Sequence, residues 1–243
     1  MTAAAAAGAA QILDTAWPGT VLITGGSSGL GAAIAAAVAG AGGRPVVLDR
    51  QPPPHPEGEH LLVDLADTGA ACRAVDQAAE RCAGLDAVVT SAGIDRCGPL
   101  DGVGLDDWER VIRVNLLGTA AVVRAALPHL RRRRGKVVTV ASTLGLRALP
   151  HATAYCASKF GVVGFTRALA AETAGEVGVT LLVPGGMATA FFDDRPEQYR
   201  PGPDAQLNPP REVAEAVLFA LSRPAGSEVR EMVLCASTEP SWP

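Results

Sequence analysis

Short apolar runs alternate with longer amphipathic stretches along this chain of 243 residues. The short runs are rich in Val, Leu and Ile, which is typical of strands. Between them, apolar residues recur every three or four positions, which predicts helices. The predicted strands are 20–24, 45–49, 60–63, 86–89, 137–141, 179–183 and 229–234, and the predicted helices are 29–41, 70–82, 106–131, 153–173 and 213–222.

This alternation predicts a single α/β domain. Strand–helix–strand units of this length form parallel sheets with helices on both faces, and right-handed crossovers make such a sheet doubly wound. We therefore expect one sheet of about seven strands over residues 19–243, with ligands at the carboxyl ends of its strands. The Ala-rich residues 1–18 are expected to form a flexible extension, since they lack the basic start and the Leu-rich stretch of a signal peptide.

Composition narrows the classes of function. Apolar residues make up 48% of the chain, enough for a sizeable core, and the net charge of −4 argues against nucleic acid as a partner. The basic cluster at 131–134 falls at a predicted helix end, where cations suit the helix dipole. The sequence has no run of ~20 apolar residues, so no membrane partner is expected. Five cysteines without a C-x-x-C pair, and no metal-ligand spacing, indicate reduced thiols in a cytoplasmic protein without a metal site.

A glycine-rich turn follows the first predicted strand. Gly25, Gly29 and Gly31 have G-x-x-x-G-x-G spacing between that strand and a predicted helix. Glycine permits the tight turn and lets backbone N–H groups approach a pyrophosphate at the positive end of the helix, which predicts dinucleotide binding. The same residues fit G-x-S-x-G around Ser27, the nucleophile elbow of hydrolases. No earlier strand and loop exist to supply an oxyanion hole, so a Ser27 hydrolase is the poorer alternative.

A carboxylate ends the second predicted strand. Asp49 lies about twenty residues beyond the glycine turn, where an acidic side chain accepts hydrogen bonds from the adenosine ribose and repels a 2′-phosphate. Arg50, next to it, could instead accommodate that phosphate. The pattern favours NAD(H) as the cofactor and leaves NADP(H) as the alternative.

A second group of residues combines types that are scarce in this chain. Only two Lys, two Tyr and two Asn occur, and Asn115, Tyr155 and Lys159 use one of each. Tyr155 and Lys159 are four residues apart, so on a helix they share one face. Ser142 follows the apolar run of the fifth predicted strand. A cluster of Tyr, Lys and Ser near a bound dinucleotide indicates hydride transfer.

Together these motifs resemble the short-chain dehydrogenase/reductase family, whose members have a Rossmann-type fold. The resemblance runs by motif from about residue 20 to residue 189, with one departure: Thr90-Ser91-Ala92-Gly93 stands where the family usually has Asn-Asn-Ala-Gly. The family pattern implies a set of coenzyme-binding residues. They are Thr24, Gly25, Ser27, Ser28, Gly29, Leu30, Gly31, Asp49, Arg50, Asp64, Leu65, Ser91, Ala92, Gly93, Tyr155, Lys159, Pro184, Gly185 and Thr189.

The resemblance also implies a mechanism. Tyr155 would be the acid in ketone reduction and the base in alcohol oxidation, because Lys159 and an oxidised nicotinamide favour its ionised form. Lys159 would also hold the nicotinamide ribose. Ser142 would hydrogen-bond the substrate oxygen, and Asn115 would hold a proton-relay water. A dinucleotide-binding sensor or partner protein with silent catalysis is a further alternative, against which the intact Tyr, Lys and Ser speak.

The family pattern places substrate-facing side chains after Ser142, around residues 94–96, and in a loop of about residues 187–209. The members selected as substrate residues are Leu144, Leu146, Phe191 and Phe192. This mainly apolar set predicts a carbonyl or secondary alcohol on a hydrophobic body, for example a 3-oxoacyl or polyketide-like ketone. Family resemblance also suggests a homo-oligomer, either tetramer or dimer, paired through the two long predicted helices.

Overall fold

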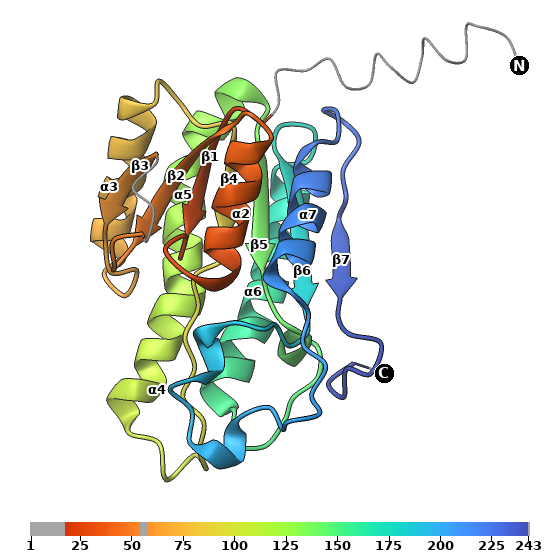
Figure 1. The fold of residues 1–243 in the computed structure, drawn as a ribbon. Helices are drawn as coiled ribbons and strands as arrows, with labels where there is room; N and C mark the ends of the chain where they lie inside the picture. Colours follow the sequence, from red (N-terminus) through yellow and green to blue (C-terminus); the bar gives the residue numbers. More distant parts are fainter. Residues whose placement is uncertain (1–17, 54–57, 243) are drawn as a thin grey trace, which may run out of the picture.

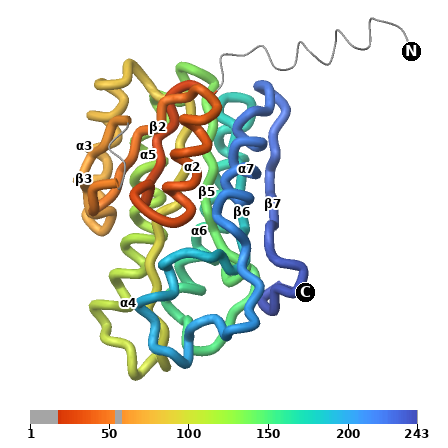
Figure 2. Tube along the Cα trace, in the orientation of Figure 1, coloured from red at the N-terminus to blue at the C-terminus, as the bar shows by residue number. Residues whose placement is uncertain are grey.

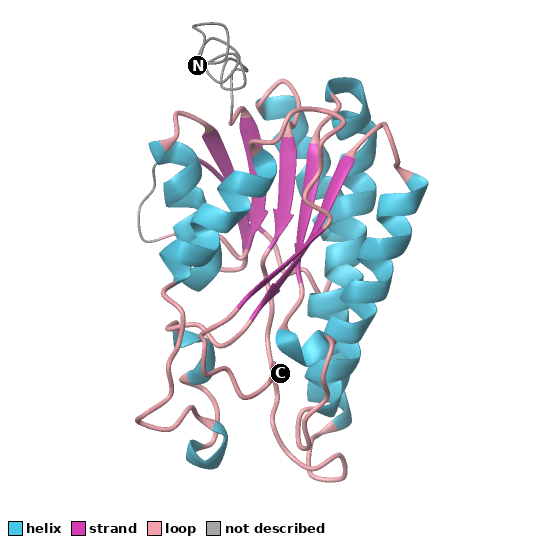
Figure 3. Ribbon diagram, turned by 90° about the vertical axis from the view of Figure 1, so that its right-hand side faces the viewer, coloured by secondary structure: helices cyan, strands magenta, loops and turns pink. Residues whose placement is uncertain are grey.

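A computed structural model describes residues 18–53 and 58–242, whose path is drawn in Figure 1 and Figure 2. Apart from Pro18, the predicted N-terminal extension lies outside the described residues. The described residues form one parallel seven-stranded sheet with helices on both faces (Figure 3), which confirms the predicted doubly wound fold class. The structure also contains each predicted strand, with small shifts at the ends.

The sheet has its topological switch point in the middle. Its order is β3-β2-β1-β4-β5-β6-β7, and every neighbouring pair is parallel. The direction of winding reverses between β1 and β4, and a crevice at such a point is where open α/β sheets bind ligands. The strands are β1 Thr20–Thr24, β2 Arg44–Asp49, β3 Glu59–Leu62, β4 Ala87–Thr90, β5 Lys136–Val140, β6 Gly178–Pro184 and β7 Glu231–Leu234.

Helices cover the sheet in two layers. On one face, α2 (Gly29–Gly40) packs against α7 (Pro210–Leu221), and on the other, α3 (Thr68–Arg81) packs against α5 (Thr119–Arg133) beside α6 (Thr153–Glu172). Successive strand residues point to opposite faces, so Leu22 joins one core cluster and Val21 the other. Each such fully buried aliphatic side chain contributes roughly 1.5–3 kcal/mol of transfer free energy.

The long helix predicted over 106–131 is interrupted, and its interruption carries a candidate catalytic residue. The segment consists of α4 (Leu105–Ile112), the π-helical turn η2 (Arg113–Gly118) and α5, and Asn115 lies within η2. Single π-turns inside helices are frequent at functional sites. By length and composition alone, Leu105–Arg133 is the one described helix that could cross a membrane, a test that buried helices of soluble proteins also pass.

The candidate site residues gather where the parallel strands end. The carboxyl ends of β1, β4, β5 and β6 lie along one edge of the sheet, because neighbouring strands run parallel. Three short 3-10 turns continue from this edge: η3 (Thr143–Gly145) after β5, and η4 (Ala190–Phe192) and η5 (Glu197–Tyr199) after β6. The fold thus brings segments from four separate parts of the chain to one place.

Candidate active site

The glycine turn between β1 and α2 is built by close backbone approach. Gly25 has a φ of +70°, and a Cβ there would lie 2.8 Å from Ala92 Cα. At Gly31 a Cβ would lie 2.1 Å from the carbonyl oxygen of Gly25, so any side chain would force the turn apart. Gly29 has a φ of +50° and faces Thr189, whose Cγ2 would be 3.4 Å from an added Cβ. The turn therefore requires glycine at all three positions.

The first turn of α2 has the chemistry of an anion seat. Ser28 is the N-cap, its side chain makes no capping hydrogen bond, and the first turn carries no acidic residue. The free N–H groups and the helix dipole therefore favour a negatively charged ligand at this end. Leu30 is buried beneath the turn and anchors it to the core. A turn shaped by glycines, before such a helix end, fits the pyrophosphate of a dinucleotide.

Asp49 closes the turn from the side of β2. Its Oδ2 accepts a hydrogen bond from Ser27 N (3.0 Å), and its Oδ1 accepts one from Gln51 N (3.0 Å). The Ser27 hydroxyl donates to the carbonyl oxygen of Gln51 at 2.7 Å. A backbone carbonyl cannot take a proton as a general base, so this arrangement does not support the hydrolase alternative. Arg50, beside Asp49, is exposed at the edge of the turn.

Asp64 and Leu65, the predicted adenine-side pair, have different surroundings. Arg110 Nη2 donates to Asp64 Oδ2 at 2.7 Å, and Ala66 N donates to Oδ1 at 2.9 Å. Burial raises the pKa of Asp64, but these two hydrogen bonds and the charges of Arg110 and Arg50 outweigh it and hold the pKa below its ordinary value. Leu65 is buried in the core cluster behind the sheet edge. The carboxylate is thus ionised and already engaged by α4.

At residues 90–93, where the family usually has Asn-Asn-Ala-Gly, Ser91 makes a side-chain hydrogen bond but Thr90 makes none within the described part of the chain. Ser91 Oγ donates to the Thr24 carbonyl at 2.6 Å, and Ala92 N donates to Thr24 Oγ1 at 3.1 Å, which ties the ends of β4 and β1 together. Thr90 Oγ1, by contrast, is buried and has no partner among the described residues. At Gly93 an added Cβ would lie 3.6 Å from Lys159 Nζ. Glycine at 93 therefore leaves the lysine ammonium uncovered on that side.

Tyr155 and Lys159 lie on one face of α6, as their spacing predicts. The Lys159 ammonium is 5.6 Å from the centre of the Tyr155 ring and donates to the carbonyl of Val140 at 2.8 Å. Both side chains are buried, with 8% of Tyr155 and 4% of Lys159 exposed. The end of β5 therefore positions the lysine, and the lysine stands beside the phenol ring.

Burial governs the protonation of both groups. It raises the pKa of Tyr155 to about 12, although the hydrogen bond with Ser142 acts in the opposite direction. Burial also lowers the pKa of Lys159 to about 8. Loss of hydration therefore outweighs the influence of the neighbouring protein groups on the phenol. That Lys159 and an oxidised nicotinamide together favour its ionised form stays a prediction. Additional positive charge is needed to lower this pKa.

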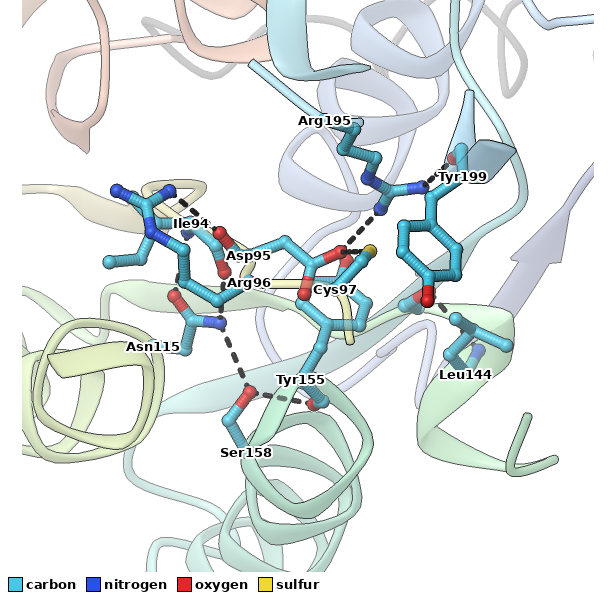
Figure 4. Close-up of polar contacts among 11 residues, drawn as sticks. Ile94, Asp95, Arg96, Cys97, Asn115, Leu144, Tyr155, Ser158, Arg195 and Tyr199 are labelled. Carbon is cyan, nitrogen blue, oxygen red and sulfur yellow. Dashed lines mark hydrogen bonds and ion pairs between the residues drawn. The ribbon is translucent and has the colours of Figure 1, made fainter. Parts of the chain in front are cut away.

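Ser142 and Asn115 are held by their own local contacts. Ser142 is the N-cap of η3, and its Oγ accepts from Leu144 N at 3.1 Å. Asn115 Oδ1 accepts from Ile94 N at 2.8 Å, and its Nδ2 donates to Ile94 O at 2.9 Å and to Ser158 Oγ at 3.0 Å (Figure 4). The Asn115 amide thus fixes the segment after β4 to α6, and both of its N–H donors are engaged.

Comparison with known proteins identifies the family. The sequence pattern of the family described as short chain dehydrogenase matches residues 19–200. The chain belongs to this family. It is 36% identical over 170 residues to D-threitol dehydrogenase of Mycolicibacterium smegmatis, covering 63% of this chain and 64% of that relative, slightly less than two thirds of its length. A second relative, 3-oxoacyl-[acyl-carrier-protein] reductase FabG of Thermotoga maritima, is 32% identical over 168 residues, covering 66% of this chain and 68% of its own.

Solved structures agree on the architecture. An alcohol dehydrogenase from the archaeon Thermococcus sibiricus, complexed with 5-hydroxy-NADP, superimposes with a TM-score of 0.79 at 26% identity. The match covers 88% of this chain and 95% of that structure. A short chain dehydrogenase from Burkholderia cenocepacia in complex with NADP matches with a TM-score of 0.78 at 28% identity, over 88% of this chain and 95% of its own. These neighbours share the architecture of this chain, and both were solved with NADP or a derivative of it.

The segment after β6 is held by contacts that the sequence did not reveal. Gly185 N donates to Leu234 O at 3.0 Å, and Gly186 N donates to Glu239 Oε2 at 2.9 Å. Thr189 caps η4, its Oγ1 accepting from Phe191 N at 3.3 Å. Glu239, near the C-terminus, thus supports the Pro184–Gly185 turn of this dehydrogenase. No sequence motif marks it, because it lies 53 residues from its partner.

The predicted substrate residues separate into two groups. Phe191 lies against Tyr155, with ring centres 5.8 Å apart, and Phe192 packs against Phe191 with ring centres 5.6 Å apart. Leu146 instead packs against a buried cluster around Val163, so its role is at least partly structural. Leu144 is half-buried beside Ser142.

The sequence did not indicate that two charged residues beside Phe191 and Phe192 form a pair. Arg195, between η4 and η5, forms a buried ion pair with Asp95, from the segment after β4. Both positions lie within stretches that the family pattern assigns to substrate, but nothing in the sequence links residues 100 positions apart.

Proposed function

We propose that this short-chain dehydrogenase transfers hydride between a nicotinamide coenzyme and a carbonyl or secondary alcohol, with Tyr155 as the proton donor and acceptor. The observation that carries this proposal is the meeting of Tyr155, Lys159 and Ser142 at the sheet edge, next to a glycine turn that any side chain would obstruct. Groups that can exchange a proton, placed next to a turn that can bind a dinucleotide, are suited to hydride transfer coupled to proton transfer.

The coenzyme would lie along the carboxyl ends of the strands. The glycine turn and the start of α2 would bind its pyrophosphate, Asp49 its adenosine ribose, and Lys159 its nicotinamide ribose. The remaining coenzyme contacts are proposed for Ser91, Ala92 and Gly93 after β4 and for Pro184, Gly185 and Thr189 after β6. When bound, the coenzyme supplies or accepts the hydride.

Each side chain then has a definable task. Ser142 would hydrogen-bond the substrate oxygen and stabilise its developing charge, while Tyr155 exchanges a proton with it. The protein's own groups keep the phenol protonated, which suits it to be the acid in reduction. For oxidation, the positive charge of an oxidised nicotinamide would favour the phenolate. Asn115 would position the segment after β4 and hold a proton-relay water.

We propose NAD(H) as the physiological coenzyme. The carboxylate of Asp49 stands at the side of the turn and would repel a 2′-phosphate. The matched structures were solved with NADP or a derivative of it, and Arg50 offers a positive charge beside Asp49. NADP(H) is therefore the alternative, and a comparison of the two coenzymes decides between them.

The substrate is proposed to have a mainly apolar carbon skeleton near the reacting carbon, since Phe191 packs against Tyr155, Phe192 packs against Phe191, and Leu144 follows closely after Ser142. Relatives are named for substrates as different as D-threitol and 3-oxoacyl groups, so family membership alone does not identify the substrate of this protein.

Assembly into a homo-oligomer, tetramer or dimer, is also proposed. Exposed apolar side chains support it: Leu105 (70% exposed), Leu117 (47%) and Phe160 (45%) lie on the α4–α5 and α6 helices. Such a surface is suited to contact with a second copy. All five cysteines are free, which supports a reducing, cytoplasmic location.

Replacing Tyr155 with Phe tests the function. The variant keeps the ring and loses the proton, so turnover of ketones and alcohols is expected to fall by ~10²–10⁴-fold with coenzyme binding unchanged. Coenzyme absorbance measures the turnover, and calorimetry measures the binding. A protein with silent catalysis would show no turnover even before the change. A hydrolase would be unaffected by Tyr155→Phe and inactivated by Ser27→Ala.

A further inference from the structure

A buried ion pair joins the substrate loop to the segment that follows β4. Arg195 Nη2 donates to Asp95 Oδ2 at 2.6 Å, and only 3% of the Asp95 side chain and 16% of the Arg195 side chain are exposed. Figure 4 shows the Arg195 guanidinium directed at the Asp95 carboxylate. An ion pair removed from water to this degree is uncommon unless it has a specific use, because burial of each charge is costly.

Further contacts hold both partners in place. The thiol of Cys97 donates to Asp95 Oδ2 at 3.1 Å, and Arg195 Nη1 donates to the carbonyl of Tyr199 at 3.3 Å. The guanidinium lies 4.6 Å from the ring centre of Phe192 and 5.3 Å from that of Phe191. The pair is therefore oriented by its neighbours rather than free to rotate toward other partners.

One donor and one acceptor of the pair are left without a hydrogen bond. Three buried side-chain polar atoms among the described residues lack a partner, and two of them are Asp95 Oδ1 and Arg195 Nε. Buried polar groups in folded proteins are nearly always satisfied, and an exception calls for an explanation. Here one exception is an acceptor and the other is an N–H donor, and both belong to one ion pair.

The pair lies close to the reacting centre. Phe191 contacts the guanidinium on one side and the Tyr155 ring, 5.8 Å away, on the other. After burial and the hydrogen bond with Ser142, the charges of Asp95 and Arg195 are the next influences on the pKa of Tyr155, the first raising it and the second lowering it. The pair therefore lies near Tyr155, with the Phe191 ring in contact with both.

We propose that Asp95 and Arg195 recognise a second hydroxyl group on the substrate, so that the enzyme prefers diols and hydroxyketones to the matching simple alcohols and ketones. This inference rests on the proposed function, since it names the substrate class of the same site. The hydroxyl would donate to Asp95 Oδ1 and accept from Arg195 Nε. Both atoms that lack partners would then be satisfied by one group.

Other substrate groups complement the pair less well. A hydroxyl combines one donor with acceptor lone pairs, as the two free atoms require. A carboxylate would face the Asp95 charge, and an ammonium would face the Arg195 charge. A wholly apolar chain would leave both atoms unsatisfied, as they are now.

The loop must open to admit such a substrate. Asp95 Oδ1 and Arg195 Nε are both shielded from solvent in this arrangement, and Arg195 is carried between η4 and η5. A hydroxyl bound to both would be enclosed when the loop returns. Selectivity for the hydroxyl therefore depends on the loop closing over the substrate.

The test compares substrates that share one carbon skeleton. The wild-type enzyme is assayed with 2-butanol, 1,3-butanediol and 2,3-butanediol in oxidation, and with 2-butanone and acetoin in reduction. We expect kcat/KM for at least one hydroxylated member to exceed that of its simple counterpart by ~10²-fold, since a site built to bind a hydroxyl rejects analogues that lack it.

Two variants distinguish recognition of the substrate hydroxyl by the pair from a role in which the pair only holds the loop in place. Arg195→Lys retains a positive charge for Asp95 but has no Nε–H in a planar fork, and Asp95→Ala removes the acceptor. In each variant the ratio of kcat/KM for the hydroxylated substrate to that for the simple substrate is expected to fall at least ~10-fold. Asp194→Asn, an exposed carboxylate on the same loop, is the matched control and should keep the wild-type ratio.

The opposite results are equally clear. Equal activity of wild type toward simple and hydroxylated substrates would overturn the proposal, as would a preference for 3-oxoacyl thioesters. Equal losses for both substrate types in Arg195→Lys would show that the pair only fastens the loop. Calorimetry with NADH shows whether each variant still folds and binds coenzyme. If the wild type bound no coenzyme and turned over none of these compounds, the proposed function itself would fail.

Discussion

The proposed coenzyme side and the proposed substrate side of the candidate site are built in different ways. The glycine turn and the start of α2 form the coenzyme side from backbone packed against backbone, with Gly31 so close to Gly25 that no side chain fits. The substrate side, at η4 and η5, is held by side chains, chiefly the Asp95–Arg195 pair and the phenylalanines beside it. The three glycines of the turn lie within seven consecutive residues, Gly25 to Gly31, whereas the ion pair joins residues 100 positions apart.

This difference suggests which side can vary. A backbone cradle suits a ligand that is constant, because its donors do not depend on side-chain identity. Side chains on a loop can be exchanged while the scaffold stays the same, so substrate choice is expected to reside there. The predictions below challenge this contrast, beginning with the change of largest expected effect.

Filling the glycine turn should damage the coenzyme side most. In Gly31→Ala the new Cβ would meet the Gly25 carbonyl oxygen, 2.1 Å away, so the turn must shift. We expect coenzyme affinity to fall ~100-fold and the free energy of unfolding to drop by ~1–3 kcal/mol. Titration calorimetry and urea unfolding measure the two effects. Gly40→Ala, in the same helix with open space around it, is the control and should bind normally. Normal binding by Gly31→Ala would refute the backbone cradle.

The pH dependence should differ between the two directions of reaction. Oxidation needs the Tyr155 phenolate and reduction needs the phenol. Because the pKa of Tyr155 is raised to about 12 by burial, the phenol persists through neutral pH. With the oxidised coenzyme saturating, kcat/KM for alcohol oxidation is expected to rise from about pH 6, by up to ~10-fold per pH unit, until the pH reaches the pKa of Tyr155 in that complex. kcat/KM for ketone reduction is expected to stay nearly flat at neutral pH. An oxidation rate independent of pH over this range would contradict Tyr155 as the base.

Coenzyme choice should depend on one carboxylate. In Asp49→Ala the charge that would repel a 2′-phosphate is absent, and Arg50 remains beside the site. The ratio of kcat/KM for NADH to that for NADPH should fall by ~10-fold or more, a change of roughly 1.4 kcal/mol. The exposed Asp101→Asn serves as a control with unchanged ratio. A wild-type enzyme that already prefers NADPH would show the assignment of Asp49 to be wrong.

Removing the contact of Glu239 with the turn after β6 should have the smallest effect of the four changes. Glu239→Ala removes the acceptor for Gly186 N, 2.9 Å away in the structure. Loss of one such hydrogen bond to a charged group is expected to cost ~1.5 kcal/mol and to raise KM for the coenzyme several-fold, with kcat little changed. Steady-state kinetics distinguish the two parameters. Glu197→Ala, exposed on η5, should leave both as they are.

Local patterns predicted most of the fold. The strands and helices follow from apolar periodicity, and their alternation is sufficient for a parallel doubly wound sheet. The interruption at Arg113–Gly118 could not be foreseen, because its sequence continues a helical pattern. That turn places Asn115 against Ile94 and Ser158, contacts that form only after the strands and helices have packed.

For the candidate site, too, local sequence patterns predicted some features and tertiary packing decided others. Spacing alone put Tyr155 and Lys159 on one helical face, since residues four apart in a helix meet. It could not show that burial would control their protonation, because burial depends on everything packed around them. The family resemblance implied Leu146 as a substrate residue, and nothing local in the sequence indicated that it also packs against the buried cluster around Val163.

By itself, then, the sequence predicted the glycine turn and the shared helical face of Tyr155 and Lys159, because each consists of residues close together along one turn or helix. Tertiary structure alone decided the pairing of Asp95 with Arg195 and of Gly186 with Glu239. Those contacts depend on where the segments after different strands meet in space. The physical reason is range: a turn or a helical face is set by bonds between near neighbours, whereas a buried pair between distant segments forms only when the whole sheet holds them together.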